Sequence, residues 1–151
     1  GATSGKLFAA GLAGDRFAVR NSGAITVIEG CDSNGCEYMT GGTVVILGNV
    51  GDNFAAGMTG GMAFIYDKKQ QFEKKVNPES VVWQNVETDY WKEFLKNLIN
   101  EHLKETGSDL SKKLIESFDD EINNFIQVCP KEMLDKLKNP ITLKKQVKKV
   151  S

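Results

Sequence analysis

Three cysteines and one histidine are the residues of this chain best suited to metal binding or nucleophilic chemistry. Cys31 and Cys36 lie five positions apart, and Cys129 and His102 are far from them in the sequence. A tetrahedral metal site needs about four N, S or O ligands, and an iron–sulfur cluster needs about three or four nearby thiolates. We therefore expect no metal site and interpret the cysteines as buried or loop thiols in a reducing compartment.

His102 is the one histidine, and a general base is the function that its chemistry would suit best. It follows Leu98 by four positions on an apolar helical face, with no Ser, Cys or Asp partner at a readable spacing. We interpret it as a structural or surface residue. Asp15, Arg16 and Arg20 form a tempting polar cluster, but neighbouring charges of this kind more often pair with each other or with turn amides. We predict no catalytic residue.

Glycines after a strand-like run raise the alternative of phosphate binding. Gly48 and Gly51 follow the apolar run 44–47. No G-x-G-x-x-G pattern opens a helix there, and no Lys-Ser/Thr pair follows, as nucleotide-binding loops require. We therefore predict no cofactor-binding residue and assign these glycines to turns.

Composition narrows the classes of partner. The 151 residues carry a formal net charge of −1 and no apolar run of the ~18 residues that a membrane span needs. The start of the chain lacks the pattern of a signal peptide. We expect a cytoplasmic protein that binds neither nucleic acid nor membrane. Because the chain begins with Gly rather than Met, we expect a fragment or a processed chain.

The first part of the chain is glycine-rich and repetitive. Fourteen of the fifteen glycines lie between Gly1 and Gly61. Four units, each a hydroxyl residue, a glycine and an apolar run, begin 18, 18 and 19 residues apart. A short fixed period predicts one structural unit per repeat. The predicted fold is a right-handed parallel β-helix, with strands at 6–10, 24–29, 43–47 and 62–66 in one parallel sheet. The predicted corners are Ser4, Gly5, Ser22, Gly23, Thr40, Gly41, Thr59 and Gly60.

The second part of the chain has helical spacing instead of repeats. The two patterns together predict a β-helix domain over residues 1–76 and a helical appendage over 77–151. Thr88 is the expected N-cap of a first helix whose apolar face runs over residues 91–103, and Gly107 is its expected C-cap. Ser108 is expected to start a second helix. Its apolar positions are Leu110, Leu114, Ile115 and Phe118, with Ile122, Phe125 and Ile126 as a continuation.

Three longer motifs add a family resemblance. Residues 14–24 (GDRFAVRNSGA), 35–42 (GCEYMTGG) and 53–61 (NFAAGMTGG) resemble signatures of the glutamate synthase large subunit, in the same order. In that family the motifs lie in the C-terminal β-helix, the G-x-G-x-G domain. The resemblance is strongest from residue 1 to about 67 and looser afterwards.

The resemblance implies a part in nitrogen assimilation. Family members convert glutamine and 2-oxoglutarate into two glutamates, using FMN, an iron–sulfur cluster and a reduced nicotinamide or ferredoxin donor. The resemblance implies that the β-helix is a non-catalytic scaffold that holds the amidotransferase and flavin domains in register, so that other domains or subunits of the enzyme are its partners. Whether this chain alone is an enzyme stays open. The alternative is a stand-alone β-helix subunit of another redox complex, such as formylmethanofuran dehydrogenase, which uses a related repeat.

The same resemblance implies a longer β-helix than this chain holds, with further coils before Gly1. A first coil without its neighbour presents unpaired strand edges. We therefore expect either a homo-oligomer joined near residues 4–10 or a cover from the helical tail.

Overall fold

Apolar runs that follow glycines form the first four strands of a single sheet. The structure, a computed structural model, describes residues 5–8, 22–30, 35–37, 39–48, 50–137 and 140–141. Its strands are β1 (Lys6–Phe8), β2 (Ser22–Ile28), β3 (Thr40–Ile46), β4 (Gly60–Tyr66), β5 (Val81–Asn85) and β6 (Phe125–Pro130). Its helices are α1 (Asp89–Thr106), α2 (Asp109–Glu116) and α3 (Phe118–Glu121), and three short 3-10 turns are η1 (Phe72–Lys74), η2 (Ile122–Asn124) and η3 (Lys131–Met133).

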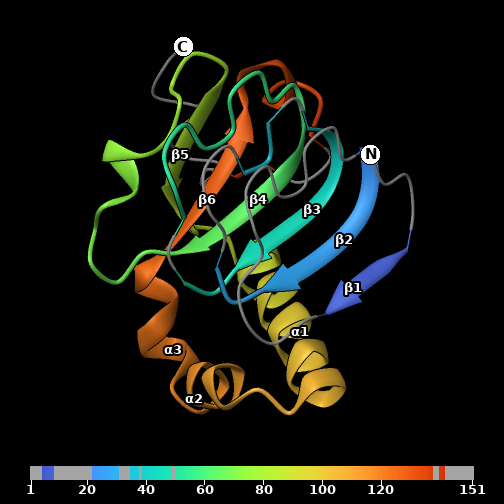
Figure 1. The fold of residues 1–151 in the computed structure, drawn as a ribbon, viewed down its shortest axis with the longest axis vertical. Helices are drawn as coiled ribbons and strands as arrows, with labels where there is room; N and C mark the ends of the chain where they lie inside the picture. The colour runs from blue at the N-terminus through green and yellow to red at the C-terminus, as the bar shows by residue number, and fades with distance from the viewer. Residues whose placement is uncertain are drawn as a thin grey trace.

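The six strands lie in the order β1-β2-β3-β4-β6-β5 (Figure 1). β1 to β4 pair in parallel, each with its neighbour in the sequence. The register sets Val27 beside Val45 and Val45 beside Phe64. The prediction that the four repeat units place their strands in one parallel sheet is confirmed.

The prediction of a β-helix is wrong. The described residues form one mixed open sheet with helices, because β6 takes the free edge of β4 and pairs with it antiparallel. β5 then pairs antiparallel with β6 and forms the far edge of the sheet. The repeat spacing predicts which of the strands β1 to β4 lie side by side. It carries no information on β6, a distant segment that pairs with the free edge of β4.

The predicted continuation of the second helix is also wrong. α2 ends at Glu116, and the single turn α3 and the 3-10 turn η2 follow it. Phe125 and Ile126, expected on the helix, begin strand β6. The run Phe125–Pro130 combines aromatic and β-branched residues that favour a strand, and pairing on both sides with β4 and β5 outweighs its helical spacing.

One face of the sheet packs on the helices. We call this set the helix-facing cluster: Val27, Val45, Leu47, Met62, Phe64, Val86, Trp91, Leu95, Leu98, Ile99, Leu114, Phe118, Ile122, Phe125, Cys129 and Ile141. α1 supplies four of these side chains at helical spacing and passes behind the strands in Figure 1.

The other face packs on turns. We call this set the turn-facing cluster: Ile28, Cys36, Met39, Val44, Ile46, Val50, Phe54, Ala55, Met58, Ala63, Ile65, Phe72, Val76, Val81 and Val128. Consecutive residues of the central strands therefore alternate between the two clusters, as with Val45 and Ile46. Burial on both faces is the usual environment of parallel strands.

The predicted helix caps are confirmed. The Thr88 hydroxyl accepts from the backbone N–H of Trp91, at 3.4 Å. Gly107 has the left-handed φ of 67° and donates its N–H to the carbonyl of Leu103. The Ser108 hydroxyl accepts from the N–H of Ser111, at 3.2 Å. The contacts of Gly107 and Ser108 fix the corner where α1 turns into α2.

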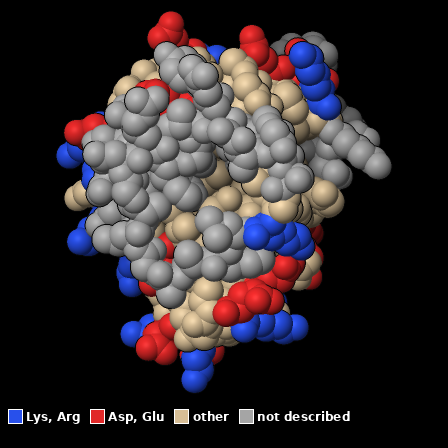
Figure 2. Space-filling view, turned by 45° about the vertical axis from the view of Figure 1, so that its right-hand side comes forward, with Lys and Arg blue, Asp and Glu red and all other residues tan. Residues whose placement is uncertain are grey.

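Residues from both sides of position 76 share the sheet and both clusters. The division into two parts at that position stays a prediction. In the part of the chain that the structure describes, no helix is long and apolar enough to span a bilayer. On the face drawn in Figure 2, the acidic and basic side chains of the described residues are interspersed rather than gathered by sign.

Candidate functional site

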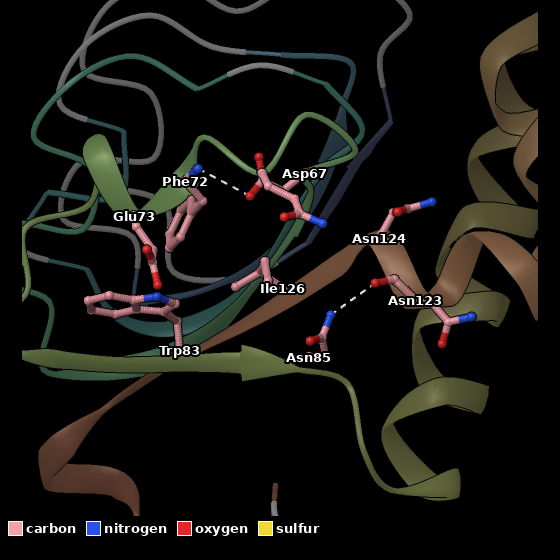
Figure 3. Close-up of a pocket in the computed structure, with 9 residues that line it drawn as sticks. Asp67, Phe72, Glu73, Trp83, Asn85, Asn123, Asn124 and Ile126 are labelled. Atoms are coloured by element: carbon pink, nitrogen blue, oxygen red, sulfur yellow. Dashed lines mark hydrogen bonds between the residues drawn. The ribbon is translucent and has the colours of Figure 1, made fainter.

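A polar cleft with aromatic walls lies beside the β5 edge of the sheet, with a volume of about 300 Å³. Its lining comes from three separate segments: the turn after β4, strand β5, and the η2–β6 junction. We call it the amide cleft, and its lining residues are Asp67, Gln70, Phe72, Glu73, Trp83, Asn85, Asn123, Asn124 and Ile126 (Figure 3).

Asp67 organises the turn that forms one side of the amide cleft. Its carboxylate accepts from the backbone N–H groups of Gln71 and Phe72, at 3.0 and 3.1 Å. Its own N–H donates to the carbonyl of Asn124, at 2.7 Å, which ties the turn to η2. Gln70 sits between them with a φ of 56°, in the left-handed region. This turn is held by backbone hydrogen bonds, and its carboxylate is occupied by them.

The opposite side of the amide cleft is held by asparagine side chains. The Asn85 amide donates to the carbonyls of Asn123 and Phe125, at 3.0 and 3.2 Å. The Asn124 amide donates to the carboxylate of Glu121, at 3.2 Å. Both amide oxygens are thereby left as acceptors at the wall of the cleft.

Two aromatic rings set the depth of the amide cleft. Phe72 is buried in the turn-facing cluster, and its ring meets Trp83 edge-to-face with centroids 6.1 Å apart. Trp83 itself is half-buried and presents part of its indole to the cleft (Figure 3). Sequence reasoning missed this site, because the lining segments are far apart in the chain and follow no known motif.

A chain of hydrogen bonds, buried in part, lies at the corner between α1 and α2. His102 Nδ1 is 2.6 Å from the hydroxyl of Ser111, and both residues are fully buried. The Ser108 hydroxyl donates to the carboxylate of Glu29, at 2.9 Å. Because Ser108 also caps α2, this chain joins the helical corner to the end of β2. The pairing of His102 with Ser111 depends on the turn at Gly107, which brings the two helices back together.

The described cysteines are interior groups. Cys36 and Cys129 are both fully buried and unbridged, and Cys31 lies outside the described residues. Burial raises the pKa of the Cys129 thiol to about 11. Among the described residues, no three His, Cys, Asp or Glu side chains gather in a way that could hold a metal ion. These residues do not fit the donor set of an iron–sulfur cluster.

A tyrosine–carboxylate pair connects the sheet to the helices. The Tyr66 hydroxyl donates to Glu121, at 2.6 Å. Burial, followed by that hydrogen bond, raises the pKa of Tyr66 well above its usual value. Glu121 therefore holds both the end of β4 and, through Asn124, one wall of the amide cleft.

The predicted repeat corners lie at the N-terminal ends of the strands where they are described, but their role as corners stays a prediction. The register sets Ser22 opposite Gly41 and Thr40 opposite Gly60. A Cβ atom added to Gly60 would overlap the Thr40 carbonyl. Ser4 and the predicted polar cluster of Asp15, Arg16 and Arg20 lie outside the described residues.

The comparison with known families agrees with this glycine pattern. The family model described as "GXGXG motif" matches residues 1–131. The chain belongs to the GXGXG motif family. The prediction that it resembles the large subunit of glutamate synthase is likewise confirmed by its relatives.

Three of these relatives differ in the electron donor that their names give. The glutamate synthase [NADPH] large chain of Azospirillum brasilense is 57% identical over 147 residues, which cover 97% of this GXGXG chain and 10% of the relative. The glutamate synthase [NADH] of Schizosaccharomyces pombe is 45% identical, over 99% of this chain and 7% of the relative. The ferredoxin-dependent glutamate synthase of Spinacia oleracea is 49% identical, over 86% of this chain and 8% of the relative. This GXGXG chain therefore spans a tenth or less of each relative.

Proposed function

We propose that this chain is the C-terminal GXGXG domain of a glutamate synthase and that its function there is structural. The proposal rests on one observation above all. The chain aligns almost from end to end with segments that make up only 7–10% of much longer synthases. The amidotransferase and flavin domains, with FMN, the iron–sulfur cluster and the donor site, would lie in other parts of such a polypeptide.

The variety of donors among the relatives supports a structural role. Segments similar to this one occur in synthases named for NADPH, for NADH and for ferredoxin. A segment that chose the electron donor would be expected to differ between them. The alternative of a subunit in another redox complex gains no support from these relatives.

The packing also suits a rigid spacer. The central strands are buried on both faces, and the helical corner is tied to β2 by the Ser108–Glu29 hydrogen bond. A spacer must keep separate reactive centres at a fixed distance and orientation, which a doubly covered sheet does better than a single exposed layer.

A chimaeric enzyme tests the proposal. The matching segment of the Azospirillum brasilense large chain would be replaced by this chain, and the same segment would be deleted in a second variant. We expect the chimaera to form glutamate from glutamine and 2-oxoglutarate and the deletion variant to lose that activity. Synthase activity that survives the deletion would contradict the structural role.

The isolated chain supplies the second arm of the test. We expect no flavin absorbance from the purified chain and no release of ammonia from glutamine. A visible flavin band, or glutaminase activity, would show that the domain itself takes part in the chemistry and would overturn the proposal.

A further inference from the structure

The amide cleft is rich in groups that attract a cation. Two carboxylates, Asp67 and Glu73, line it together with four side-chain amides, and no Lys or Arg is among the lining residues that the structure describes. The nearby Lys68, Lys69 and Lys74 are exposed and belong to the same turn, but they are not part of the lining.

The two carboxylates of the amide cleft differ in what they already bind. Both oxygens of Asp67 are used by backbone N–H groups of the turn. Glu73 is exposed and, among the described residues, has no hydrogen-bond or ion-pair partner. In the view of Figure 3 its carboxylate is drawn above the indole of Trp83, and both side chains line the cleft. The cleft thus combines one uncommitted negative charge with an aromatic surface beside it.

The aromatic surface has a fixed position. Trp83 is held edge-to-face by Phe72, which is itself 2% exposed, and it stands on strand β5 opposite Val128 of β6. A cation over an aromatic ring gains energy from the negative face of the ring. A planar cation gains further by stacking on the indole while it donates hydrogen bonds in its own plane.

We propose that the amide cleft receives an arginine side chain presented by another domain of the longer polypeptide. The inference deepens the proposed function and depends on it for the identity of the occupant. A guanidinium carries five N–H donors in one plane, and the cleft offers it the Glu73 carboxylate and the amide oxygens of Asn85 and Asn124 as acceptors. A lysine ammonium has three donors and cannot stack on Trp83 in the same way.

Size and surroundings favour a tethered side chain over a free cation. The volume of about 300 Å³ is at the lower limit for small-molecule sites and suits a single side chain. The three flanking lysines weaken the attraction for a cation that arrives from solution. A side chain presented by an adjoining domain overcomes this through its high effective concentration.

Small capped amino acids probe the cleft on the full chain. N-acetyl-arginine amide represents the peptide-borne side chain, and N-acetyl-citrulline amide has the same shape without the charge. The indole N–H signal of Trp83 is followed by NMR, with Trp91→Phe used to assign it. We expect a saturable shift with the arginine compound at millimolar concentration and a shift at least several-fold weaker with the citrulline compound.

Two matched variants locate the binding. Glu73→Gln removes the uncommitted charge and is expected to weaken arginine binding by about twofold to fivefold, in line with an exposed ion pair. Glu132→Gln, in the exposed turn η3, should leave it unchanged. An equal response to citrulline, no saturable response, or an unaltered affinity in Glu73→Gln would each overturn the proposal.

A titration with free arginine distinguishes a free amino acid from a peptide-borne side chain as the natural occupant of the cleft. If the free amino acid bound more than tenfold tighter than the capped form, the cleft would be a metabolite site, and the interdomain contact would be rejected. These titrations need no other domain, whereas the chimaera does. A chimaera that fails while the arginine titration succeeds contradicts the proposed function, and the reverse result contradicts only the arginine contact.

Discussion

The two faces of the sheet reach full burial by different means. The helix-facing cluster is covered by side chains of regular helices, mainly from α1. The turn-facing cluster is covered by irregular segments between residues 35 and 80. Interior positions such as Leu95 on one side and Met58 on the other are equally buried. Cover by helices therefore depends on side-chain shape, while cover by turns depends on backbone geometry.

The turns on the second face repeat one unusual conformation. Cys36 and Ala55, nineteen positions apart, have left-handed φ angles of 59° and 64°. In each turn the carbonyl of that residue accepts from the N–H three positions later, on Met39 and Met58. The N–H of Ala55 also donates to the carbonyl of Gly35, so that one turn stacks on the next. Residues other than glycine adopt such φ angles only at a cost in conformational free energy.

The largest loss of stability is expected from a substitution at Gly60. In Gly60→Ala the new methyl group would overlap the carbonyl of Thr40, a backbone atom that the parallel pairing holds in place. We expect a loss of at least about 3 kcal/mol of unfolding free energy, the upper end of the usual cost of overpacking. Urea denaturation followed by circular dichroism measures it.

Gly107→Ala is the matched control. Gly107 has a positive φ of 67°, and open space surrounds the position of an added Cβ. The expected cost is that of a left-handed backbone alone, about 1–2 kcal/mol. If the two variants lost equal stability, the close approach of the β3 and β4 backbones at Gly60 would not be the limiting feature.

Truncation of buried side chains should compare the two covers directly. Leu95→Ala and Met58→Ala each remove a fully buried side chain, and each should cost about 2–5 kcal/mol. The difference should appear in amide exchange: faster exchange in α1 and α2 for the first variant, and in the turns around residues 35–58 for the second. Uniformly faster exchange in both variants would mean that the two covers unfold as one unit.

A smaller effect is expected at the helical corner. Ser108→Ala removes both the cap of α2 and the hydrogen bond to Glu29, and should cost about 1–2 kcal/mol. Thr88→Ala removes only the cap of α1 and should lose less unfolding free energy. Thermal denaturation of the two variants measures the difference. Equal losses would show that the link from the corner to β2 adds no stability.

The last effect should be seen only in alkali. The folded pKa of Cys129, about 11, is above the ordinary value of 9.0 because the thiol is buried. Folding thus favours the neutral thiol, and this contribution is complete below pH 9 and is lost as the pH rises towards 11. Unfolding free energy measured across that range should fall less steeply in Cys129→Val. An unchanged slope would contradict the assignment to this thiol.

The local features of the fold were predictable from sequence because their causes are local. Thr88, Gly107 and Ser108 mark helix ends by their own chemistry. The repeat spacing gave the offsets of two strand pairs, with Ile25 beside Thr43 and Thr43 beside Met62. The first pair, Lys6 with Ile25, is shifted by one residue from the repeat alignment.

The distant features were not predictable in the same way. Phe118, Ile122 and Phe125 have the spacing of one helical face, and nothing within that segment reveals that β4 has a free edge to offer it. The amide cleft follows from that same long-range pairing. Its lining includes Ile126 on β6 and Trp83 on β5, which meet only when β6 joins the sheet.

The antiparallel pairing of β4 with β6 also has a consequence for the order of folding. Tyr66 and Phe125 are partners across 58 intervening residues, whereas the parallel partners are separated by fewer than twenty. Closing the longer loop costs more chain entropy, so it should be a late step on the pathway. Until then the edge of β4 is exposed and open to pairing with other chains. A ribosome that has released β4 must therefore synthesise some sixty further residues before that edge is protected, which makes this interval the period of greatest risk of aggregation.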